Sequence, residues 1–305
     1  MKIIITGAGG FLGNELLTQL QDYKNIEIYA LTSNTTLLKQ RYFENENIHI
    51  YSNHISVLEE INITSRDVLL NCAFPRNVQL NMADGLDYIK DVLQKAVEEG
   101  IGSVINISSQ SIYSQRRLRG AKESDPVNLD SVYAVGKYAS ELLTKTICKN
   151  IFYTNVRLAS LVGIGFNQRI TNKLINQVVD NREIQIIGGQ QKFSFMDVRD
   201  AASALILLAF SNSNTWQPIY NLGSGESYTF RQLAELIVFT GKKLLDINVK
   251  LNVENNDNWK NTELDNTLFC KDFNWKPRYS MQDTLKTLYL DIMEKRGIEN
   301  EKNYI

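Results

Sequence analysis

Hydrophobic positions along the first half of the chain form short runs, separated by longer stretches with helical periodicity. Residues 85–99 and 133–149 repeat their apolar positions every three or four residues, as amphipathic helices do. The short runs are rich in β-branched residues and occupy residues 2–5, 26–31, 48–51, 68–73, 104–108 and 152–158. This alternation predicts an α/β fold, a doubly wound parallel sheet with right-handed crossover connections.

The pattern is less regular beyond residue 163. We expect a helix over residues 170–181, a short strand over residues 184–187, and a helix over residues 200–210 that returns to the first domain. The stretch 252–261 is rich in asparagine and is predicted to be a surface loop.

A glycine-rich turn follows the first strand directly, with the sequence Thr-Gly-Ala-Gly-Gly-Phe-Leu-Gly over residues 6–13. Gly7 permits a tight turn, Gly10 lets the backbone approach a phosphate, and Gly13 lets the following helix pack closely on the strand. The N-terminus of that helix offers free N–H donors and partial positive charge. Strand, turn and helix together predict a dinucleotide diphosphate site, with contacts from Gly7, Gly10, Phe11, Leu12 and Gly13.

A tyrosine and a lysine lie four residues apart on the second predicted helix, so they share one helix face. A cation near the phenol of Tyr133 favours phenolate and lowers its pKa, and Lys137 can supply that cation. The pair could therefore work as a general base near neutral pH. The alternative is a surface pair on an ordinary helix, because this spacing is common. Asp130 or Ser131 can cap the helix.

Serines end the predicted strand 104–108 and continue beyond it. In parallel sheets the ligand lies at the carboxyl ends of the strands. A hydroxyl such as that of Ser109 could bind a substrate hydroxyl or polarise a carbonyl there. The alternative is that these serines satisfy turn backbone.

Taken together, these motifs resemble those of the extended short-chain dehydrogenase/reductase superfamily, in its sugar-nucleotide epimerase/dehydratase branch, whose members include UDP-glucose 4-epimerase-like enzymes. The resemblance covers nearly the whole chain. It rests on the glycine turn, on Ser109, on Tyr133 with Lys137, and on weaker matches in the same order. Those weaker matches are residues 71–73, Arg157 with Leu158 before Gly163, residues 197–200, residues 220–225 and residues 274–277.

The resemblance implies an NAD(P)-dependent nucleotide-sugar epimerase. Tyr133 would be the general base, Lys137 would hold the nicotinamide ribose, and Ser109 would bind the sugar oxygen, with hydride moving to and from a ring carbon, C4 by analogy. One alternative is a nucleotide-sugar 4-ketoreductase that consumes NAD(P)H. An alternative of another class is a dinucleotide-binding sensor or scaffold without catalysis, which typically loses the Tyr-Lys pair.

The resemblance also implies further contacts and a division of the chain. Residues 1–165, completed by about 195–223, would form the NAD(P)-binding Rossmann domain, and residues 166–194 and 224–305 a smaller substrate-binding lobe. The further cofactor contacts are Thr32, Ser33, Cys72 and Ala73, besides Tyr133 and Lys137 themselves. The substrate contacts are Phe74, Ser109, Ser111, Tyr133 and Ser160.

Two departures from the family bear on the reaction and the cofactor. Family dehydratases carry Asp-Glu directly after the catalytic Ser or Thr, and here Gln110 and Ser111 stand there, which argues against a 4,6-dehydratase. NAD-type sites place an acid at the end of the second strand, where this chain has residues 31–34, Leu-Thr-Ser-Asn. NAD and NADP both stay open, with Lys39 or Arg41 as candidates to reach a 2′-phosphate.

The substrate end departs as well. The family's Asn after the sixth strand is replaced by Ser160, and its diphosphate-binding Arg by Phe193, with Lys192 adjacent. Neither Phe nor Lys reproduces the bidentate contact of Arg. A nucleotide diphosphate would therefore be held differently here, or the substrate is another activated sugar.

Composition limits the partners. The chain of 305 residues has 33 basic and 34 acidic residues, which favours neither nucleic acid nor a membrane surface. Three separated cysteines and two histidines give no disulfide framework and no metal site, and they favour a cytoplasmic location. The expected partner is a small nucleotide-sugar substrate. A homodimer through helices 85–99 and 133–149 is expected only from the family resemblance.

Overall fold

Seven parallel strands form one sheet in the computed structural model, which describes residues 1–75, 77–166, 170–254 and 259–298. The strand order β3-β2-β1-β4-β5-β6-β11 reverses between β1 and β4, as in a doubly wound fold. The predicted fold class is confirmed. The strands are β1 (Lys2–Thr6), β2 (Glu27–Thr32), β3 (Ile48–Ser52), β4 (Val68–Asn71), β5 (Ser103–Ser109), β6 (Phe152–Leu158) and β11 (Ile219–Leu222).

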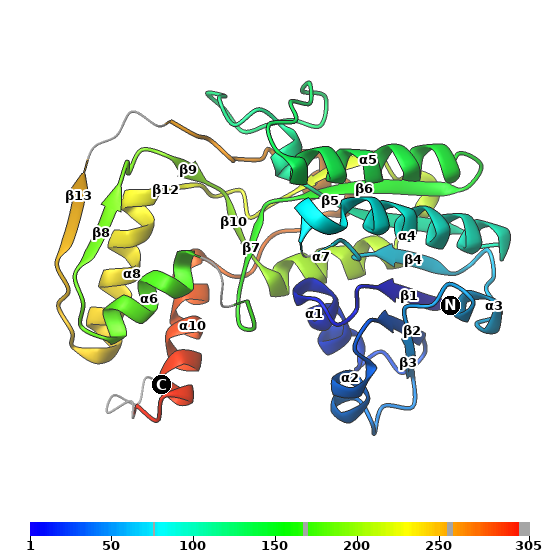
Figure 1. Cartoon of the computed structure of the whole chain (residues 1–305), viewed down its shortest axis with the longest axis horizontal. Helices are drawn as coiled ribbons and strands as arrows, with labels where there is room; N and C mark the ends of the chain where they lie inside the picture. Colours follow the sequence, from blue (N-terminus) through cyan, green and yellow to red (C-terminus); the bar gives the residue numbers. More distant parts are fainter. Residues whose placement is uncertain (76, 167–169, 255–258, 299–305) are drawn as a thin grey trace.

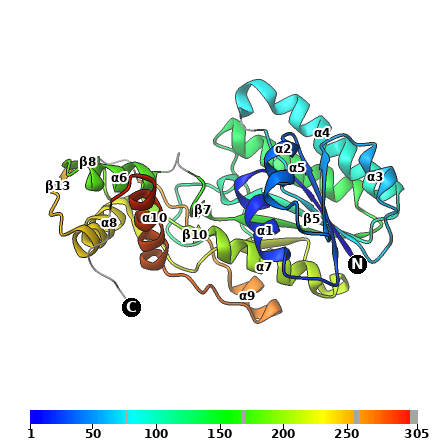
Figure 2. The same ribbon diagram turned by 90° about the horizontal axis from the view of Figure 1, so that it is seen from below.

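Helices cover both faces of this sheet (Figures 1 and 2). One face packs against α1 (Phe11–Leu20), α2 (Thr35–Arg41) and α7 (Val198–Phe210). The other face packs against α3 (Val57–Glu60), α4 (Val78–Glu98) and α5 (Val132–Ile147). The strands are buried on both faces, and this explains their continuous apolar runs.

A smaller lobe lies to the left of the sheet in Figure 1 and has its own apolar core. Two helices, α6 (Ile170–Val179) and α8 (Phe230–Leu245), pack together there, and α10 (Met281–Lys295) packs on both. The remaining elements are β7 (Ser160–Val162), β8 (Ile184–Ile187), β9 (Lys192–Phe193), β10 (Phe195–Asp197), β12 (Tyr228–Thr229), β13 (Leu251–Glu254), α9 (Thr267–Phe273) and the short 3-10 turns Gln110–Ile112 and Ser213–Thr215. The lobe strands pair as β7 with β10, β8 with β13 and β9 with β12.

Two expected elements differ from the structure. The helix expected at residue 85 begins at Val78, because Asn77 caps it and accepts a hydrogen bond from the Leu80 backbone N–H. The stretch 252–261 is not a surface loop throughout. Its first residues belong to β13, which pairs with β8, and Asn261 is fully buried. Residues 255–258 of that stretch lie outside the described residues.

A row of buried polar side chains crosses four neighbouring strands. Thr6 donates to Asn71 Oδ1 at 2.7 Å, Asn71 to Asn106 Oδ1 at 2.9 Å, and Asn106 to Asn155 Oδ1 at 2.8 Å. These residues are direct neighbours in the strand register. We call this row the asparagine ladder. A shift of one strand by a residue would leave buried amides unpaired, so the ladder favours the observed register.

Within the described residues, no helix is both long and apolar enough to cross a membrane.

Candidate active site

The glycine turn connects β1 to α1 in a conformation that a side chain would disrupt. Gly7 has a φ of +65°, and a Cβ there would lie 2.8 Å from the backbone nitrogen of Ala73. A Cβ at Gly13 would lie 2.5 Å from the Gly7 carbonyl oxygen, and one at Gly10 would lie 3.0 Å from it. Glycine is therefore required at the turn and at the helix contact for steric reasons.

The N-terminus of α1 is suited to an anion. Gly10 stands at the N-cap position, and no side chain among the described residues caps the helix. The first backbone N–H groups of the helix therefore keep their capacity to bind an anionic group. Turn and helix end together fit a dinucleotide diphosphate, with Gly7, Gly10 and Gly13 shaping the site and Phe11 and Leu12 beginning the helix.

The end of β2 carries hydroxyl and amide groups in place of a carboxylate. Thr32 is buried, and its Oγ1 accepts a hydrogen bond from the Asn34 backbone at 3.2 Å. Ser33 is exposed beside it. Arg41 is bonded to α1, donating to Asn14 Oδ1 at 2.9 Å and to the Thr18 hydroxyl at 3.1 Å. The Arg41 guanidinium, a candidate to reach a 2′-phosphate, is therefore hydrogen-bonded to α1 in this structure.

Helix α5 brings the predicted tyrosine and lysine together. Ser131, rather than Asp130, caps the helix by accepting from the Ala134 backbone N–H at 3.1 Å. Tyr133 is 38% exposed, whereas Lys137 is only 5% exposed. The Lys137 ammonium lies 6.0 Å from the centre of the Tyr133 ring. One partner thus faces the solvent side and the other is held inside the protein.

Lys137 is fixed by β5 and by Phe74. Its Nζ donates to the Ile107 carbonyl at 2.9 Å and lies 4.0 Å from the centre of the Phe74 ring. Phe74 in turn meets Tyr133 edge to face, with ring centres 5.4 Å apart. Phe74, predicted to contact substrate, therefore contacts both members of the Tyr-Lys pair.

Burial lowers the pKa of Lys137 to about 8, and the nearby Cys72 and Glu141 oppose that shift. Burial also raises the pKa of Cys72 to about 12, so the thiol is uncharged at neutral pH. Glu141 is thus the anionic neighbour that supports the charge of Lys137. A lysine with such a pKa is still mostly cationic at pH 7.

Ser109 ends β5, and its Oγ accepts hydrogen bonds from the backbone and hydroxyl of Ser111 at 3.2 and 3.0 Å. The two predicted serines therefore lie together at the carboxyl end of the sheet. Ile107, which binds Lys137, lies two residues before Ser109 on the same strand. The backbone of β5 thus connects Ser109 to Lys137.

Cys72 and Ala73 follow β4 and adjoin the glycine turn. The Cys72 backbone N–H donates to the Thr6 carbonyl at 3.2 Å, and the Ala73 N–H donates to the Thr6 hydroxyl at 3.3 Å. The predicted cofactor contacts from β1 and β4 are thereby gathered at one point of the sheet edge.

The two positions where the chain departs from the family at the substrate end, Ser160 and Phe193, lie in the short strands β7 and β9. Ser160 begins β7, and its backbone N–H donates to the Ser194 carbonyl at 3.2 Å. Phe193 packs near Phe195 and Phe230, with ring centres 5.9 and 6.2 Å away. An aromatic cluster therefore stands where the family resemblance expects an arginine.

Two buried residues near the site were not predicted. Glu141 lies one turn after Lys137, and Asn106 belongs to the asparagine ladder and also donates to Ser140 of α5 at 3.3 Å. The sequence carried a signal for Glu141, because a position four residues after a site lysine lies on the same helix face. For Asn106 the signal was an amide inside an otherwise apolar strand.

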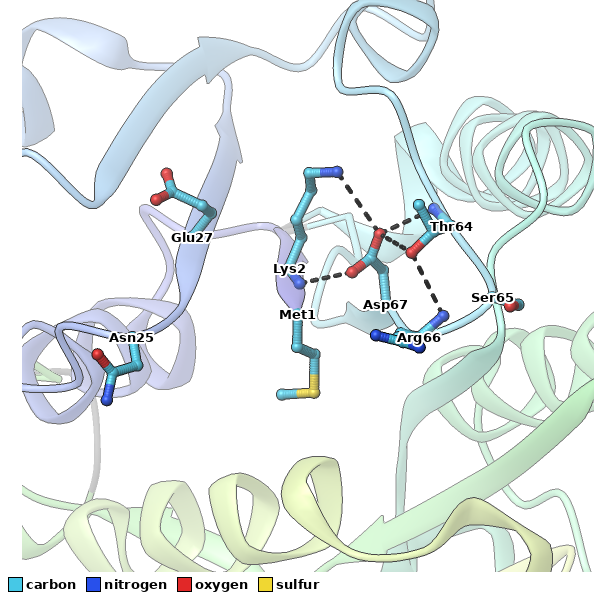
Figure 3. A pocket seen from close by; sticks show the side chains of 8 residues that line it. All are labelled: Met1, Lys2, Asn25, Glu27, Thr64, Ser65, Arg66 and Asp67. Carbon is cyan, nitrogen blue, oxygen red and sulfur yellow. Dashed lines mark hydrogen bonds and ion pairs between the residues drawn. The ribbon is translucent and has the colours of Figure 1, made fainter.

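A shallow cavity of 430 Å³ lies at the opposite, amino-terminal end of β1, β2 and β4 (Figure 3). Within it Asp67 accepts from the backbone N–H of Lys2 at 2.6 Å and from that of Thr64 at 2.8 Å. Ligands of parallel sheets bind at the carboxyl ends, so this cavity is separate from the candidate active site. Among the described residues, no group of three or more His, Cys, Asp or Glu side chains is placed to hold a metal ion.

The sheet order, the glycine turn and the tyrosine and lysine of α5 together define a dinucleotide-binding enzyme of the extended short-chain dehydrogenase/reductase type. The model of the NAD dependent epimerase/dehydratase family matches residues 3–223, and the chain belongs to that family. It is accordingly an NAD(P)-dependent enzyme of the epimerase/dehydratase type, and the alternative of a non-catalytic sensor or scaffold is set aside.

Among curated proteins, the chain is similar to the dTDP-4-dehydro-6-deoxyglucose reductase of Escherichia coli. The two are 24% identical over 95% of this chain and 97% of the reductase. Among solved structures it is similar to the UDP-N-acetylglucosamine 4-epimerase of Bacillus cereus, with a TM-score of 0.80, 18% identity and full coverage of both chains. The UDP-glucuronic acid 4-epimerase of the same organism, solved with UDP-glucuronic acid and NAD, gives a TM-score of 0.81 at 20% identity over 97% of this chain and 100% of that one.

Proposed function

We propose that this protein is a nucleotide-sugar epimerase that moves hydride to and from a sugar ring carbon, C4 by analogy with its relatives. The observation that carries the proposal is the placement of Lys137, buried against the backbone of β5 and next to Tyr133, at the sheet end that also bears the glycine turn. The proposed base Tyr133, the cation Lys137 and the proposed diphosphate site at the glycine turn thus lie at the same carboxyl edge of the sheet. Epimerisation needs no acid-base pair beyond Ser109, Tyr133 and Lys137.

In this proposal residues 7–13 would hold the diphosphate of the dinucleotide, which would supply a hydride acceptor and donor when bound. Tyr133 takes the proton of a sugar hydroxyl, while Ser109 donates a hydrogen bond to the same oxygen. Lys137 binds the nicotinamide ribose and stabilises the phenolate of Tyr133 through its charge. When the sugar has turned to present its other face, Tyr133 returns the proton.

The second candidate is a nucleotide-sugar 4-ketoreductase. It is favoured by the similarity to a reductase over almost the entire chain and by the missing carboxylate at Thr32, Ser33 and Asn34. Without that acid the site does not repel a 2′-phosphate, so NADPH is admissible. The same three residues would serve, with Tyr133 donating a proton to the new hydroxyl.

The test is the dinucleotide content of the purified protein, followed by a panel of UDP-glucose, UDP-N-acetylglucosamine, UDP-glucuronic acid and dTDP-4-dehydro-6-deoxyglucose. Retained NAD with isomerised product and no net cofactor consumption supports the epimerase. One NAD(P)H oxidised per molecule of product supports the reductase. Absence of hydride transfer with every sugar, in protein that binds dinucleotide, would contradict both.

The substrate lobe is part of the proposal. We propose that residues 1–165, completed by 195–223, bind the dinucleotide and that residues 166–194 and 224–305 bind the sugar nucleotide. Ser111, Ser160 and Phe74 would contact the sugar, and the aromatic cluster at Phe193 replaces an arginine contact with the diphosphate. If this assignment holds, saturation transfer NMR should give weaker saturation of the UDP-sugar protons with Phe193→Ala than with the unmodified protein.

We further propose a homodimer through the helices predicted at residues 85–99 and 133–149. Apolar side chains on α5 support it, since Val132, Val135 and Leu142 are each about half exposed. Light scattering should report twice the chain mass, and Leu142→Glu should lower it to one chain. A cytoplasmic location stays a proposal, which fractionation of cells would test.

A further inference from the structure

A buried ion pair lies directly behind the candidate catalytic residues. Arg157 of β6 binds Glu141 of α5 in a bidentate manner, from Nε to Oε1 at 2.9 Å and from Nη2 to Oε2 at 2.7 Å. Ser108 of β5 donates to the same carboxylate at 2.5 Å. All three residues are at most 4% exposed. We call these three residues the Glu141 cluster.

The cluster is connected to segments farther along the chain. Arg157 Nη1 donates to the Tyr113 hydroxyl at 2.7 Å, and that hydroxyl donates to Asn221 Oδ1 at 2.9 Å. Asn221 in turn donates to the carbonyls of Ala121 and Asp265 at 2.8 and 3.2 Å. One continuous set of hydrogen bonds thus runs from α5 to the segment that leads into α9.

Two of the residues proposed for catalysis, Ser109 and Lys137, lie beside a member of the cluster. Ser108 directly precedes Ser109, and Glu141 follows Lys137 by one helical turn. Building on the proposed function, we propose that Glu141 is a positioning residue: its carboxylate fixes α5 against the end of β5, and so sets Lys137 and Tyr133 relative to Ser109. Because the carboxylate accepts from both strands β5 and β6, its loss would release the helix from both.

Glu141 also acts on Lys137 through its charge. The groups that face the Lys137 ammonium are the Cys72 thiol at the end of β4, the Ile107 carbonyl of β5, the Phe74 ring, and Tyr133 and Glu141 of α5 itself. The thiol is uncharged at neutral pH. Removing the carboxylate charge, and leaving Arg157 without its partner, therefore lowers the pKa of Lys137 further.

The chain offers a matched control. Asp197 is a second buried carboxylate that binds an arginine in a bidentate manner, to Arg199 at 2.9 and 2.7 Å. It caps α7 and receives a hydrogen bond from Thr284 of α10, away from α5. Loss of either carboxylate should lower the melting temperature, but only loss of Glu141 should change the behaviour of Lys137.

The experiment compares Glu141→Gln and Asp197→Asn in two assays. The first is the pH dependence of Lys137 acetylation by acetic anhydride, read by mass spectrometry, which needs no substrate. Glu141→Gln should move its midpoint down by about one pH unit, whereas Asp197→Asn should leave it unchanged. The second is kcat with the UDP-sugar that turns over, which Glu141→Gln should lower about 10²-fold at an unchanged KM.

An unshifted midpoint in folded Glu141→Gln, or equal shifts in both variants, would overturn the inference. If Glu141→Gln does not fold, Arg157→Lys keeps both charges but loses the bidentate contact. It should then lower kcat at an unshifted midpoint, and an unchanged kcat would overturn the positioning role. Tyr133→Phe separates the two proposals. If this variant keeps its turnover, the proposed function is wrong. If Tyr133→Phe is inactive while Glu141→Gln has unchanged kcat and an unchanged midpoint, only the positioning role is wrong.

Discussion

The carboxyl end of the parallel sheet and the small lobe bury their side chains in different ways. At the sheet end, buried polar groups bind one another, in the asparagine ladder and in the Glu141 cluster. The core of the lobe is built from apolar side chains, among them Leu174, Ile237 and Leu285. Its buried Tyr289 hydroxyl donates to a backbone carbonyl, that of Ile237 at 2.8 Å.

This difference separates two requirements. A network of mutually satisfied polar groups has few alternative arrangements, because each displacement leaves a buried donor or acceptor unpaired. An apolar core tolerates repacking as long as its volume is kept. The sheet end is therefore suited to hold reacting groups in fixed positions, and the lobe is suited to vary with the substrate.

The largest expected effect is at the sheet end. Tyr133→Phe removes one oxygen and should lower turnover by about 10²–10⁴-fold, because the general base is lost. Dinucleotide affinity and melting temperature should stay close to those of the unmodified protein. Tyr138→Phe, on the same helix, is the control and should keep full activity. Calorimetric titration with NAD and steady-state kinetics check both variants, and substantial turnover by Tyr133→Phe would remove the catalytic assignment.

The next effect concerns the glycine turn. Gly10→Val places a branched side chain against the Gly7 carbonyl, since even a Cβ would lie 3.0 Å from it. Losing one charge-assisted hydrogen bond to the diphosphate should weaken dinucleotide binding at least about tenfold. Gly223→Ala, whose Cβ would meet only an ordinary contact at 3.4 Å, should bind as before. Equal affinity in the two variants would contradict a diphosphate site at the turn.

The pH dependence follows from the burial of Lys137. Its pKa is lowered to about 8, so the ammonium is present below that pH and is lost as the pH rises through it. We expect kcat/KM, which reports groups of the free enzyme, to fall about tenfold per pH unit on the alkaline side. A profile that stays flat up to pH 10 would show that the charge of Lys137 is not required.

A smaller effect is expected from the ladder. Asn106→Leu keeps the volume but leaves Asn71 Nδ2 and Asn155 Oδ1 without their partner. The free energy of unfolding should fall by about 2–4 kcal/mol, from two unpaired buried groups. Because Asn106 also donates to Ser140 of α5, the helix that carries Tyr133 and Lys137, kcat should fall too. Urea denaturation and steady-state kinetics measure the two losses. A variant with an unchanged free energy of unfolding would show that the asparagine ladder does not stabilise the sheet.

The lobe should respond in the opposite way. Leu285→Ala removes a fully buried side chain and should lower the free energy of unfolding by about 2–5 kcal/mol. Dinucleotide affinity should nevertheless be unchanged, and any kinetic effect should lie in KM for the sugar nucleotide. If this variant instead weakened NAD binding, the contrast between the two regions would fail.

Much of the sheet end could be predicted from the sequence, because its elements follow local rules. The glycine turn between a strand and a helix is encoded by neighbouring residues, and so is the Tyr-Lys pair on one helix face. The Glu141 cluster joins residues 108, 141 and 157, whose pairing depends on strand order and not on spacing. The strand pairing in the lobe is still harder to predict from the sequence. Strand β13 pairs with β8 across more than sixty residues, and the asparagine-rich stretch that contains part of β13 has no alternating apolar pattern that predicts a strand.

The most direct test of the account is hydride transfer itself. NADPH or NADH deuterated at the transferable position would be incubated with the protein and dTDP-4-dehydro-6-deoxyglucose, and NAD-loaded protein would be incubated with C4-deuterated UDP-sugars. The account predicts deuterium at the sugar ring carbon in the first case, or inverted product that keeps its label in the second, and loss of either reaction in Tyr133→Phe. The account would be contradicted by reduced sugar that carries no deuterium from the cofactor, or by inverted product that has lost its C4 deuterium. Equal product formation by Tyr133→Phe would contradict it as well.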